Sequence, residues 1–210
     1  MIVGDSLSAG YGLAENESWV TLLQNRLSAK HYDYRVVNAS ISGDTTGGGL
    51  RRLPRALQIH APDIVLIELG GNDGLRGTPV AVIRSNLARM IELGQATGAK
   101  IILAGMLMPP NYGQAYTDEF AAIYPGLAAE YDTALIEFFM EKVATDPALL
   151  QADQIHPNAK GQSYLLDNVW GVLEPLLRPP HPKIAAIVSC IPSAAARGSC
   201  ASRIGRPTTM

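Results

Sequence analysis

The runs IVLIEL (64–69) and KIILAG (100–105) carry the strongest secondary-structure signal in the chain. Both are rich in β-branched residues and leucine, and glycine or proline bounds each of them. A strand that lacks polar alternation has both faces buried, which is the usual condition in a parallel sheet. The two runs therefore predict strands of a parallel sheet.

Weaker strand signals and longer helical patterns alternate around these two runs. Further strand candidates are YRVVNAS (34–40), TALIEFF (133–139) and the stub at residues 1–3. Helical periodicity covers five segments, at 18–27, 45–57, 79–97, 117–131 and 158–177. One strand and one helix in every ~30 residues predict an α/β fold, with a central parallel sheet and helices on both faces. In such sheets, sites form at the carboxyl ends of the strands.

The overall composition is that of a globular domain. The chain has 210 residues, of which 47% are hydrophobic and 17% charged, enough for one sizeable core. A formal net charge of -2 gives no electrostatic reason to expect nucleic acid as a partner. No apolar run approaches the ~18 residues that span a bilayer, so we expect no stable membrane insertion. The oligomeric state is left open.

The composition changes after Arg178. Residues 179–210 contain no acidic residue and four of the 17 Lys and Arg residues, so we expect a domain at 1–178 and a poorly ordered tail at 179–210. Both cysteines, Cys190 and Cys200, lie in this tail, which leaves the domain no thiol nucleophile. We expect no signal peptide in the given residues, because neither a basic segment nor an apolar h-region precedes Gly4. We expect a periplasmic or secreted protein if the chain is a processed mature form, and a cytoplasmic one if Met1 is the native start.

The first apolar run ends at Gly4-Asp5-Ser6, which makes Ser6 a candidate nucleophile. A serine hydroxyl needs a base to take its proton. His156 is suited to this role because Asp153, three residues earlier, can accept Nδ1–H and leave Nε2 free. Pro157 suits the first position of the following helix, which would fix His156 at the helix start.

Simpler interpretations of these residues stay open. A Gly-Asp-Ser turn is a common strand exit, and Asp153 and His156 could serve only to cap the last helix. The other three histidines, His31, His60 and His181, are predicted to be surface or capping residues.

Attack by serine on a carbonyl builds an oxyanion, which needs hydrogen-bond donors. Gly43 has no side chain, so its N–H could approach a ligand closely. Asn72 follows Gly70-Gly71 and carries an amide that can donate. A turn glycine and an Asx-turn are the alternatives for these two residues. One group at each of three strand ends favours a single site over separate coincidences.

Taken together, these motifs resemble those of the GDSL, or SGNH, hydrolases. The resemblance covers about residues 1–178 and rests on GDSLSAGYGL (4–13), Gly43, GGNDGLRG (70–77) and DQIHPNAKGQ (153–162). Within the family, the chain is most similar to the bacterial thioesterase I, lysophospholipase and arylesterase group. That likeness lies in GYGL (10–13), NASISGDTTGGGLRRLP (38–54) and PPNYG (109–113). The first strand is shorter than usual for the family, and the tail has no counterpart.

The resemblance implies a flavodoxin-like three-layer sandwich, the SGNH hydrolase fold. It implies a serine esterase that acts on carboxylic esters of acyl or aryl groups, with thioesters as a further class. Ser6 would be the nucleophile, His156 the base and Asp153 its orienting partner. The oxyanion hole would comprise the Ser6 N–H, the Gly43 N–H and the Asn72 side chain. No metal or organic cofactor is implied.

The acyl pocket is expected beside two loops that follow strand ends, at 74–80 and 106–113. Their residues Leu75, Met106, Leu107, Met108 and Tyr112 could line an apolar groove, as the subfamily suggests. Methionine and leucine beside a strand end are as often plain core.

Three other interpretations of the sequence are a nucleotide-binding module, an ordinary α/β-hydrolase and an inactive relative. A nucleotide-binding module is disfavoured, because the glycines at 43–49 lack the Lys and Ser/Thr of a P-loop. An ordinary α/β-hydrolase is disfavoured, because Ser6 lies in no G-x-S-x-G motif. A catalytically inactive relative that binds acyl ligands is the remaining alternative.

Overall fold

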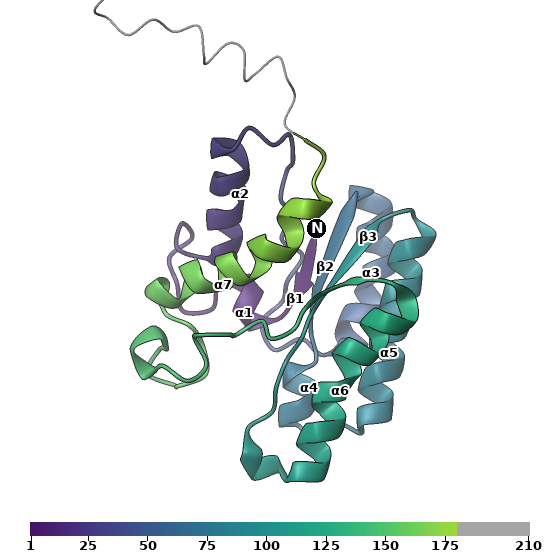
Figure 1. The fold of residues 1–210 in the computed structure, drawn as a ribbon, viewed down its shortest axis with the longest axis vertical. Coiled ribbons are helices and arrows are strands. Elements are labelled where there is room, and N and C mark those ends of the chain that lie inside the picture. Colours follow the sequence, from purple (N-terminus) through teal and green to yellow (C-terminus); the bar gives the residue numbers. More distant parts are fainter. Residues whose placement is uncertain (180–210) are drawn as a thin grey trace, which may run out of the picture.

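A computed structural model of the chain describes residues 1–179 (Figure 1). Four parallel strands form one sheet in the order β1-β2-β3-β4. Their bounds are β1 Ile2–Gly4, β2 Ile64–Glu68, β3 Lys100–Ala104 and β4 Ala134–Ile136. The parallel sheet expected from the sequence is therefore confirmed, with the two predicted central runs as β2 and β3.

Seven α-helices and three short 3₁₀ helices connect and flank the strands in the described part. The α-helices are α1 Ser6–Ala9, α2 Trp19–Ala29, α3 Thr46–His60, α4 Gly71–Leu75, α5 Val80–Ala96, α6 Gln114–Tyr131 and α7 Ala159–Leu173. The 3₁₀ helices are η1 Pro110–Tyr112, η2 Pro147–Leu149 and η3 Glu174–Leu176. The five predicted helices are present, whereas the short α1 and α4 carried too few residues for a periodic pattern.

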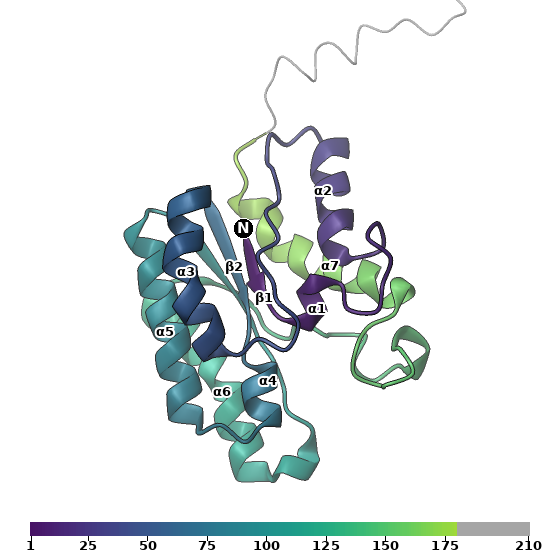
Figure 2. The ribbon, with the colours of Figure 1, turned by 180° about the vertical axis from the view of Figure 1, so that it is seen from behind.

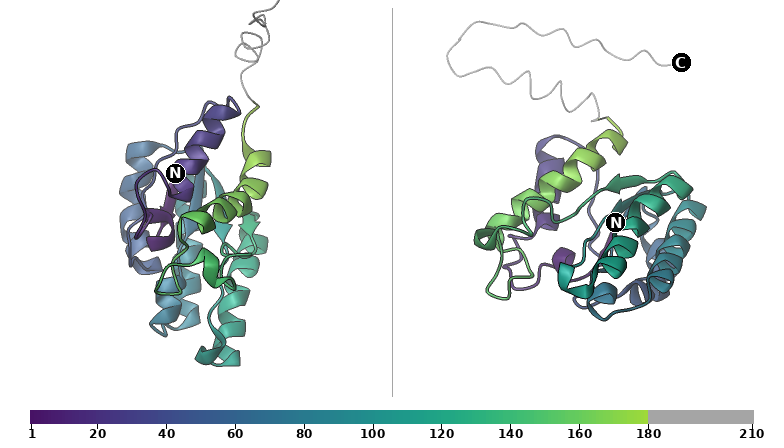
Figure 3. Two further views of the ribbon diagram at one scale, coloured as in Figure 1. Left: turned by 90° about the vertical axis from the view of Figure 1, so that its left-hand side faces the viewer. Right: turned by 60° about the horizontal axis from the view of Figure 1, so that its bottom comes forward.

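The helices form a layer on each face of the sheet. Helices α3, α5 and α6 pack together on one face, and α2 and α7 pack together on the other (Figures 1 and 2). Turned views show the sheet between these two groups (Figure 3). Both faces of β2 and β3 are covered, so the central side chains of these strands are 0% exposed: Val65, Ile67, Ile102 and Leu103. This burial confirms the three-layer α/β architecture.

The predicted strand at 34–40 is wrong. Only one isolated parallel bridge, Ile2 with Asn38, joins this segment to β1. The Ile2 N–H donates to Val37 O and the Ala39 N–H donates to Ile2 O. The Val36 N–H is taken by the side chain of Gln24 instead of a strand neighbour. Because β1 is three residues long, it offers too little edge for a full ladder.

The carboxyl ends of β1 and β2 lead directly into helices. Gly4 is followed by Asp5 and α1, and Glu68 is followed by Leu69, Gly70 and α4. Gly70 has φ +119°, and a Cβ there would lie 2.3 Å from the Tyr124 hydroxyl, which donates to Leu69 O. Only glycine fits this turn. It places Asn72 on the same edge of the sheet as Ser6.

Residues 180–210 lie outside the described part, and with them all but the first residue of the tail predicted at 179–210, including Cys190, Cys200 and His181. Within residues 1–179 no helix is long and apolar enough to cross a membrane.

Candidate active site

Ser6, His156 and Asp153 lie in one hydrogen-bonded line at the carboxyl edge of the sheet. The distance from Ser6 Oγ to His156 Nε2 is 2.8 Å, and that from His156 Nδ1 to Asp153 Oδ2 is 2.7 Å. The imidazole side chain is 17% exposed. The structure thus brings together the three residues that the sequence marked as nucleophile, base and orienting acid.

Asp153 holds its own loop as well as the imidazole. Its Oδ1 accepts the backbone N–H groups of Ile155 and His156, each at 3.0 Å. These bonds, with that from the His156 ring, lower the pKa of Asp153 to about 2. The carboxylate therefore stays ionised through the ordinary pH range and keeps Nδ1 protonated.

Helix α7 is capped by a different residue from the one expected. Asn158 is the N-cap, and its side chain accepts the N–H groups of Lys160 and Gly161. Pro157 therefore precedes the cap and does not occupy the first helical turn. Asp153 and His156 make no capping bond, so the alternative that they only cap α7 is wrong. His31 and His60 are exposed, the first just beyond α2 and the second at the last position of α3.

Asn72 reaches the site but is already bonded. Its Nδ2 donates to Asp5 Oδ2 and to Asp44 O, both at 2.9 Å. Both amide hydrogens have acceptors in this geometry. The Ser6 N–H, at the first position of α1, has no acceptor within its helix.

Gly43 lies beside the site in an exposed turn with φ +78°. Its carbonyl accepts from Arg76, and the next residue, Asp44, is the one whose carbonyl holds Asn72. Gly43 does not line the cavity at Ser6. Its link to the site therefore runs through its neighbour Asp44, whose carbonyl holds Asn72.

A cavity of about 400 Å³ opens at Ser6 and His156. Most of its lining side chains are apolar, and most follow the strand ends. The lining residues are Asp5, Ser6, Leu7, Gly71, Asn72, Leu75, Met106, Leu107, Met108, Pro109, Phe138, Met140, Ala144, Leu150, Gln154, Ile155 and His156. Four of the five predicted pocket residues are among them.

Tyr112 is the exception among the predicted pocket residues. It lies in η1, and its hydroxyl donates to Leu75 O at 3.1 Å. Its ring approaches Tyr116 instead of the cavity. Tyr112 thus supports the backbone of the loop at Leu75 from outside, because its side chain is satisfied there.

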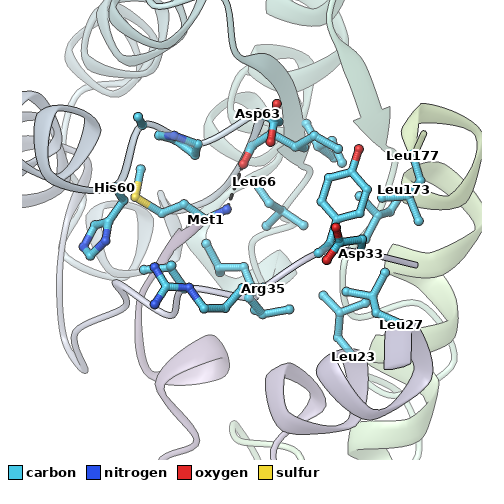
Figure 4. Close-up of a pocket in the computed structure, with 18 residues that line it drawn as sticks. Met1, Leu23, Leu27, Asp33, Arg35, His60, Asp63, Leu66, Leu173 and Leu177 are labelled. Atoms are coloured by element: carbon cyan, nitrogen blue, oxygen red, sulfur yellow. Dashed lines mark hydrogen bonds between the residues drawn. The ribbon is translucent and has the colours of Figure 1, made fainter. Parts of the chain in front are cut away.

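Another cavity lies at the opposite end of the sheet, around the start of β1 (Figure 4). It measures about 230 Å³, and its apolar part includes Leu66, Leu173 and Leu177. None of its 18 lining residues is a serine, threonine or cysteine. A serine and a histidine therefore both line the cavity at the carboxyl edge but do not both line this one. No cluster of three or more His, Cys, Asp or Glu side chains suited to a metal ion occurs in residues 1–179.

Two buried carboxyl groups, those of Asp5 and Glu68, lie close to Ser6, and Glu68 was not predicted from the sequence. Glu68 is 0% exposed, and its Oε2 accepts the Ser8 hydroxyl at 2.6 Å and the Asp5 N–H at 3.3 Å. Asp5 is 3% exposed, caps α1 through Leu7 N–H and accepts from Asn72. A glutamate inside the apolar run IVLIEL was the signal that could have marked this pair.

Burial governs the charge on these two groups. Desolvation raises the pKa of Glu68 well above its ordinary value, and the nearby Asp5 carboxylate raises it further. Desolvation also raises the pKa of Asp5, to about 6. Neither group forms an ion pair with a described residue. Of the two groups, Glu68 is therefore the one that favours its protonated form, and Asp5 is the one that favours its charge.

The family assignment follows from sequence comparison. Residues 2–164 match the model of the GDSL-like Lipase/Acylhydrolase family. This chain belongs to that family. The matched range contains Ser6, Asp153 and His156, and the family resemblance inferred from the motifs is confirmed.

Three curated relatives are named for hydrolytic activities. Esterase TesA of Pseudomonas aeruginosa is 52% identical over 177 residues, which cover 84% of this chain and 88% of that protein. Arylesterase of Vibrio mimicus is 48% identical over 169 residues, 80% of this chain and 84% of that one. Thioesterase 1/protease 1/lysophospholipase L1 of Escherichia coli strain K12 is 45% identical over 177 residues, 84% of each chain. The alternative of an inactive ligand-binding protein has no support among these relatives.

A solved structure of TesA has the same fold. It superposes with a TM-score of 0.82 at 53% identity and covers 84% of this chain and 98% of that one. The expected SGNH hydrolase fold is thereby confirmed.

Replacing Glu68 by Gln tests the charge assignment of the buried pair. The folded state keeps a proton that the unfolded state releases above its ordinary pKa of 4.5. Wild-type stability therefore falls as the pH rises above that value, by a contribution that E68Q lacks. We expect the free energy of unfolding of E68Q, relative to wild type, to increase as the pH rises above 4.5, by at most ~1.4 kcal/mol per pH unit. Denaturant unfolding at several pH values measures it.

Glu119→Gln is the matched control, because Glu119 is an exposed glutamate on α6. Its stability difference from wild type should stay constant over the same pH range. A difference for E68Q that is equally constant would show that Glu68 is ionised in the folded protein.

Proposed function

We propose that this chain hydrolyses carboxylic esters of acyl and aryl groups through an acyl-enzyme on Ser6. The observation that carries the proposal is the continuous line from Ser6 Oγ through His156 to Asp153, with bonds of 2.8 and 2.7 Å. A hydroxyl, an imidazole and a carboxylate in this order are the components of nucleophilic acyl transfer. Family membership and the activities for which the relatives are named support the same reaction.

Acylation begins when Ser6 Oγ attacks the ester carbonyl carbon and its proton passes to His156 Nε2. Asp153 stabilises the imidazolium through Nδ1–H. The tetrahedral intermediate collapses, the bond from carbon to the alkoxy oxygen breaks, and the alcohol takes the proton from Nε2. Water then attacks the acyl-serine with His156 as base, which releases the acid and restores the Ser6 hydroxyl.

The oxyanion is proposed to bind to the Ser6 N–H, the Gly43 N–H and the Asn72 amide. The Ser6 N–H needs no rearrangement, since it has no acceptor within α1. The Asn72 amide already serves Asp5 and Asp44, so it donates to the oxyanion by sharing a hydrogen with one of them. The Gly43 N–H belongs to the same turn as Asp44, whose carbonyl accepts from Asn72.

The cavity supports an acyl chain as the group bound beside Ser6. Its volume of about 400 Å³ and its leucine and methionine lining suit a flexible hydrocarbon chain. Leu75, Leu107 and Ile155 are 42%, 50% and 53% exposed, so the mouth is apolar and open to water. An open mouth favours varied leaving groups, including the thiol of an acyl thioester.

Ser6→Ala is expected to reduce the hydrolysis of p-nitrophenyl butyrate by at least ~10⁴-fold, because no other group can form the acyl-enzyme. Ser163→Ala is the control, since Ser163 is an exposed serine of α7 bonded only to Lys160 O. Steady-state kinetics of both variants beside wild type measure the effect. Activity that survives in S6A would overturn the proposed mechanism.

Asp153→Asn is expected to lower kcat by about 10⁴-fold, the size of effect seen when an active-site histidine loses its orienting carboxylate. Because the pKa of Asp153 is about 2, the wild-type enzyme should show no loss from its protonation above pH 4. A kcat–pH profile of both proteins checks this. Near-normal activity in D153N would remove Asp153 from the catalytic group.

Longer acyl chains are expected to raise kcat/KM by up to about fourfold per methylene until the cavity is filled, the equivalent of ~0.8 kcal/mol per buried CH₂. Leu107→Asp at the mouth should weaken this preference and leave p-nitrophenyl acetate hydrolysis within about twofold. Ile59→Asp is the control, because Ile59 is 59% exposed on α3, away from the cavity. A flat profile from acetate to palmitate would argue against the cavity as acyl site.

A further inference from the structure

The loop that carries Asp153 and His156 is closed at its base by backbone bonds. The Gln151 N–H donates to His156 O at 2.7 Å, and Leu150 and Pro157 form an antiparallel bridge. Asp153 bonds two N–H groups inside the loop. The loop at 150–157 is therefore one stiff unit whose position on the domain must be set from outside.

In the described structure, only two hydrogen bonds join this loop to the segment that begins at Ser6 and includes Tyr11. One is the bond between His156 and Ser6 itself. The other runs from Gln151 Nε2 to Tyr11 O, at 2.8 Å between residues 140 positions apart. Gln151 Nε2 also donates to Pro157 O at 3.1 Å. The Gln151 amide thus bonds both the loop at 150–157, through Pro157 O, and the segment after Ser6, through Tyr11 O.

The Gln151 side chain is tightly enclosed on the Ser6 side. Gly12 has φ +72°, and a Cβ on it would lie 2.2 Å from Gln151 Oε1. The glycine therefore leaves the space in which the glutamine lies flat against the chain. Any side chain at this position would push the amide away from Tyr11 O.

Tyr11 continues the contact to the imidazole. Its ring centroid lies 4.6 Å from that of His156, with the planes at 39°. The side chain is 52% exposed, so few other contacts hold the ring in place. The bond from Gln151 to the Tyr11 carbonyl fixes the backbone from which this ring projects.

From these contacts we infer that Gln151 is a positioning residue for the proposed reaction: it bonds the loop at 150–157 to Tyr11 and so sets where His156 Nε2 lies relative to Ser6 Oγ. It contacts no substrate, because it is absent from the cavity lining. A misplacement of about 1 Å between reacting groups can cost ~10²-fold in rate. Loss of Gln151 is therefore expected to act on kcat and to leave KM nearly unchanged.

The test uses Gln151→Met and Gln151→Ala. Methionine keeps most of the volume against Gly12 but has no N–H to donate, so Q151M separates the hydrogen bonds from packing. Gln95→Ala is the matched control, because the Gln95 amide also makes one bond to a distant backbone carbonyl, Tyr131 O at 2.8 Å, away from the site. We would measure kcat and KM on p-nitrophenyl butyrate, Tm, and the rate of Ser6 phosphonylation by a p-nitrophenyl alkylphosphonate.

Both Gln151 variants are expected to lose about 10- to 100-fold in kcat and in phosphonylation rate, with KM within twofold and Tm close to that of Q95A. Phosphonylation needs His156 to take the Ser6 proton, so it reports the alignment directly. Wild-type kcat in Q151M would overturn the inference, as would a loss explained by a lower Tm or a higher KM. The inference rests on the proposed function, but S6A separates the two: an inactive S6A beside a fully active Q151M would refute only the role of Gln151.

Discussion

The hydrogen bond between Ser6 and His156 joins residues that are 150 positions apart, and the whole domain lies between them. One partner follows the first strand and the other precedes the last long helix. They meet because every strand of the sheet is parallel, so all carboxyl ends point to one edge. The sheet register and the packing of α7 against α2 therefore both contribute to the geometry of a single 2.8 Å contact. Local structure also fixes each of the two residues. Helix α1 begins at Ser6, and Asp153 bonds the backbone and the imidazole of His156.

This arrangement has an electrostatic cost at its centre. Asp5 must cap α1 and hold Asn72, which places a carboxylate out of contact with water. Glu68 lies beside it and accepts from the Asp5 N–H. Two charges in this volume would repel with no ion-pair partner among residues 1–179 to offset them, which favours a proton on Glu68 over a second charge. The neutral glutamate still accepts the Ser8 hydroxyl, and it fixes the turn after β1 without adding a second negative charge beneath the nucleophile.

The sequence predicted the parts of the fold that depend on burial. β2 and β3 are buried on both faces, so their continuous apolar runs identify them as strands in the sequence. The segment at 34–40 carries a weaker strand pattern, and its backbone groups bond Ile2 of β1 and the side chains of Gln24 and Arg52. The length of the neighbouring strand β1 depends on the tertiary fold, so the sequence of residues 34–40 alone does not show it.

The candidate site divides in the same way. The short-range pair of Asp153 and His156 was visible because three residues separate them. Tyr112 was misplaced because its hydroxyl finds Leu75 O, a backbone group 37 positions away. Gln151 was missed since its partner, Tyr11 O, belongs to a loop at the other end of the chain. A polar side chain that bonds distant backbone has no sequence signature.

The charge on Asp5 links the buried pair to the chemistry. Attraction between Asp5 and His156 is one of the effects that hold the pKa of Asp5 down against its burial. In the proposed reaction, the same attraction stabilises the imidazolium that forms when Ser6 loses its proton. The anion also holds the Asn72 amide, whose dipole is then fixed before any substrate arrives. A donor that is already oriented needs little reorganisation when the oxyanion forms. A proton on Glu68 allows Asp5 to serve both purposes, because a second charge there would raise the pKa of Asp5 and weaken its charge-assisted bond with Asn72.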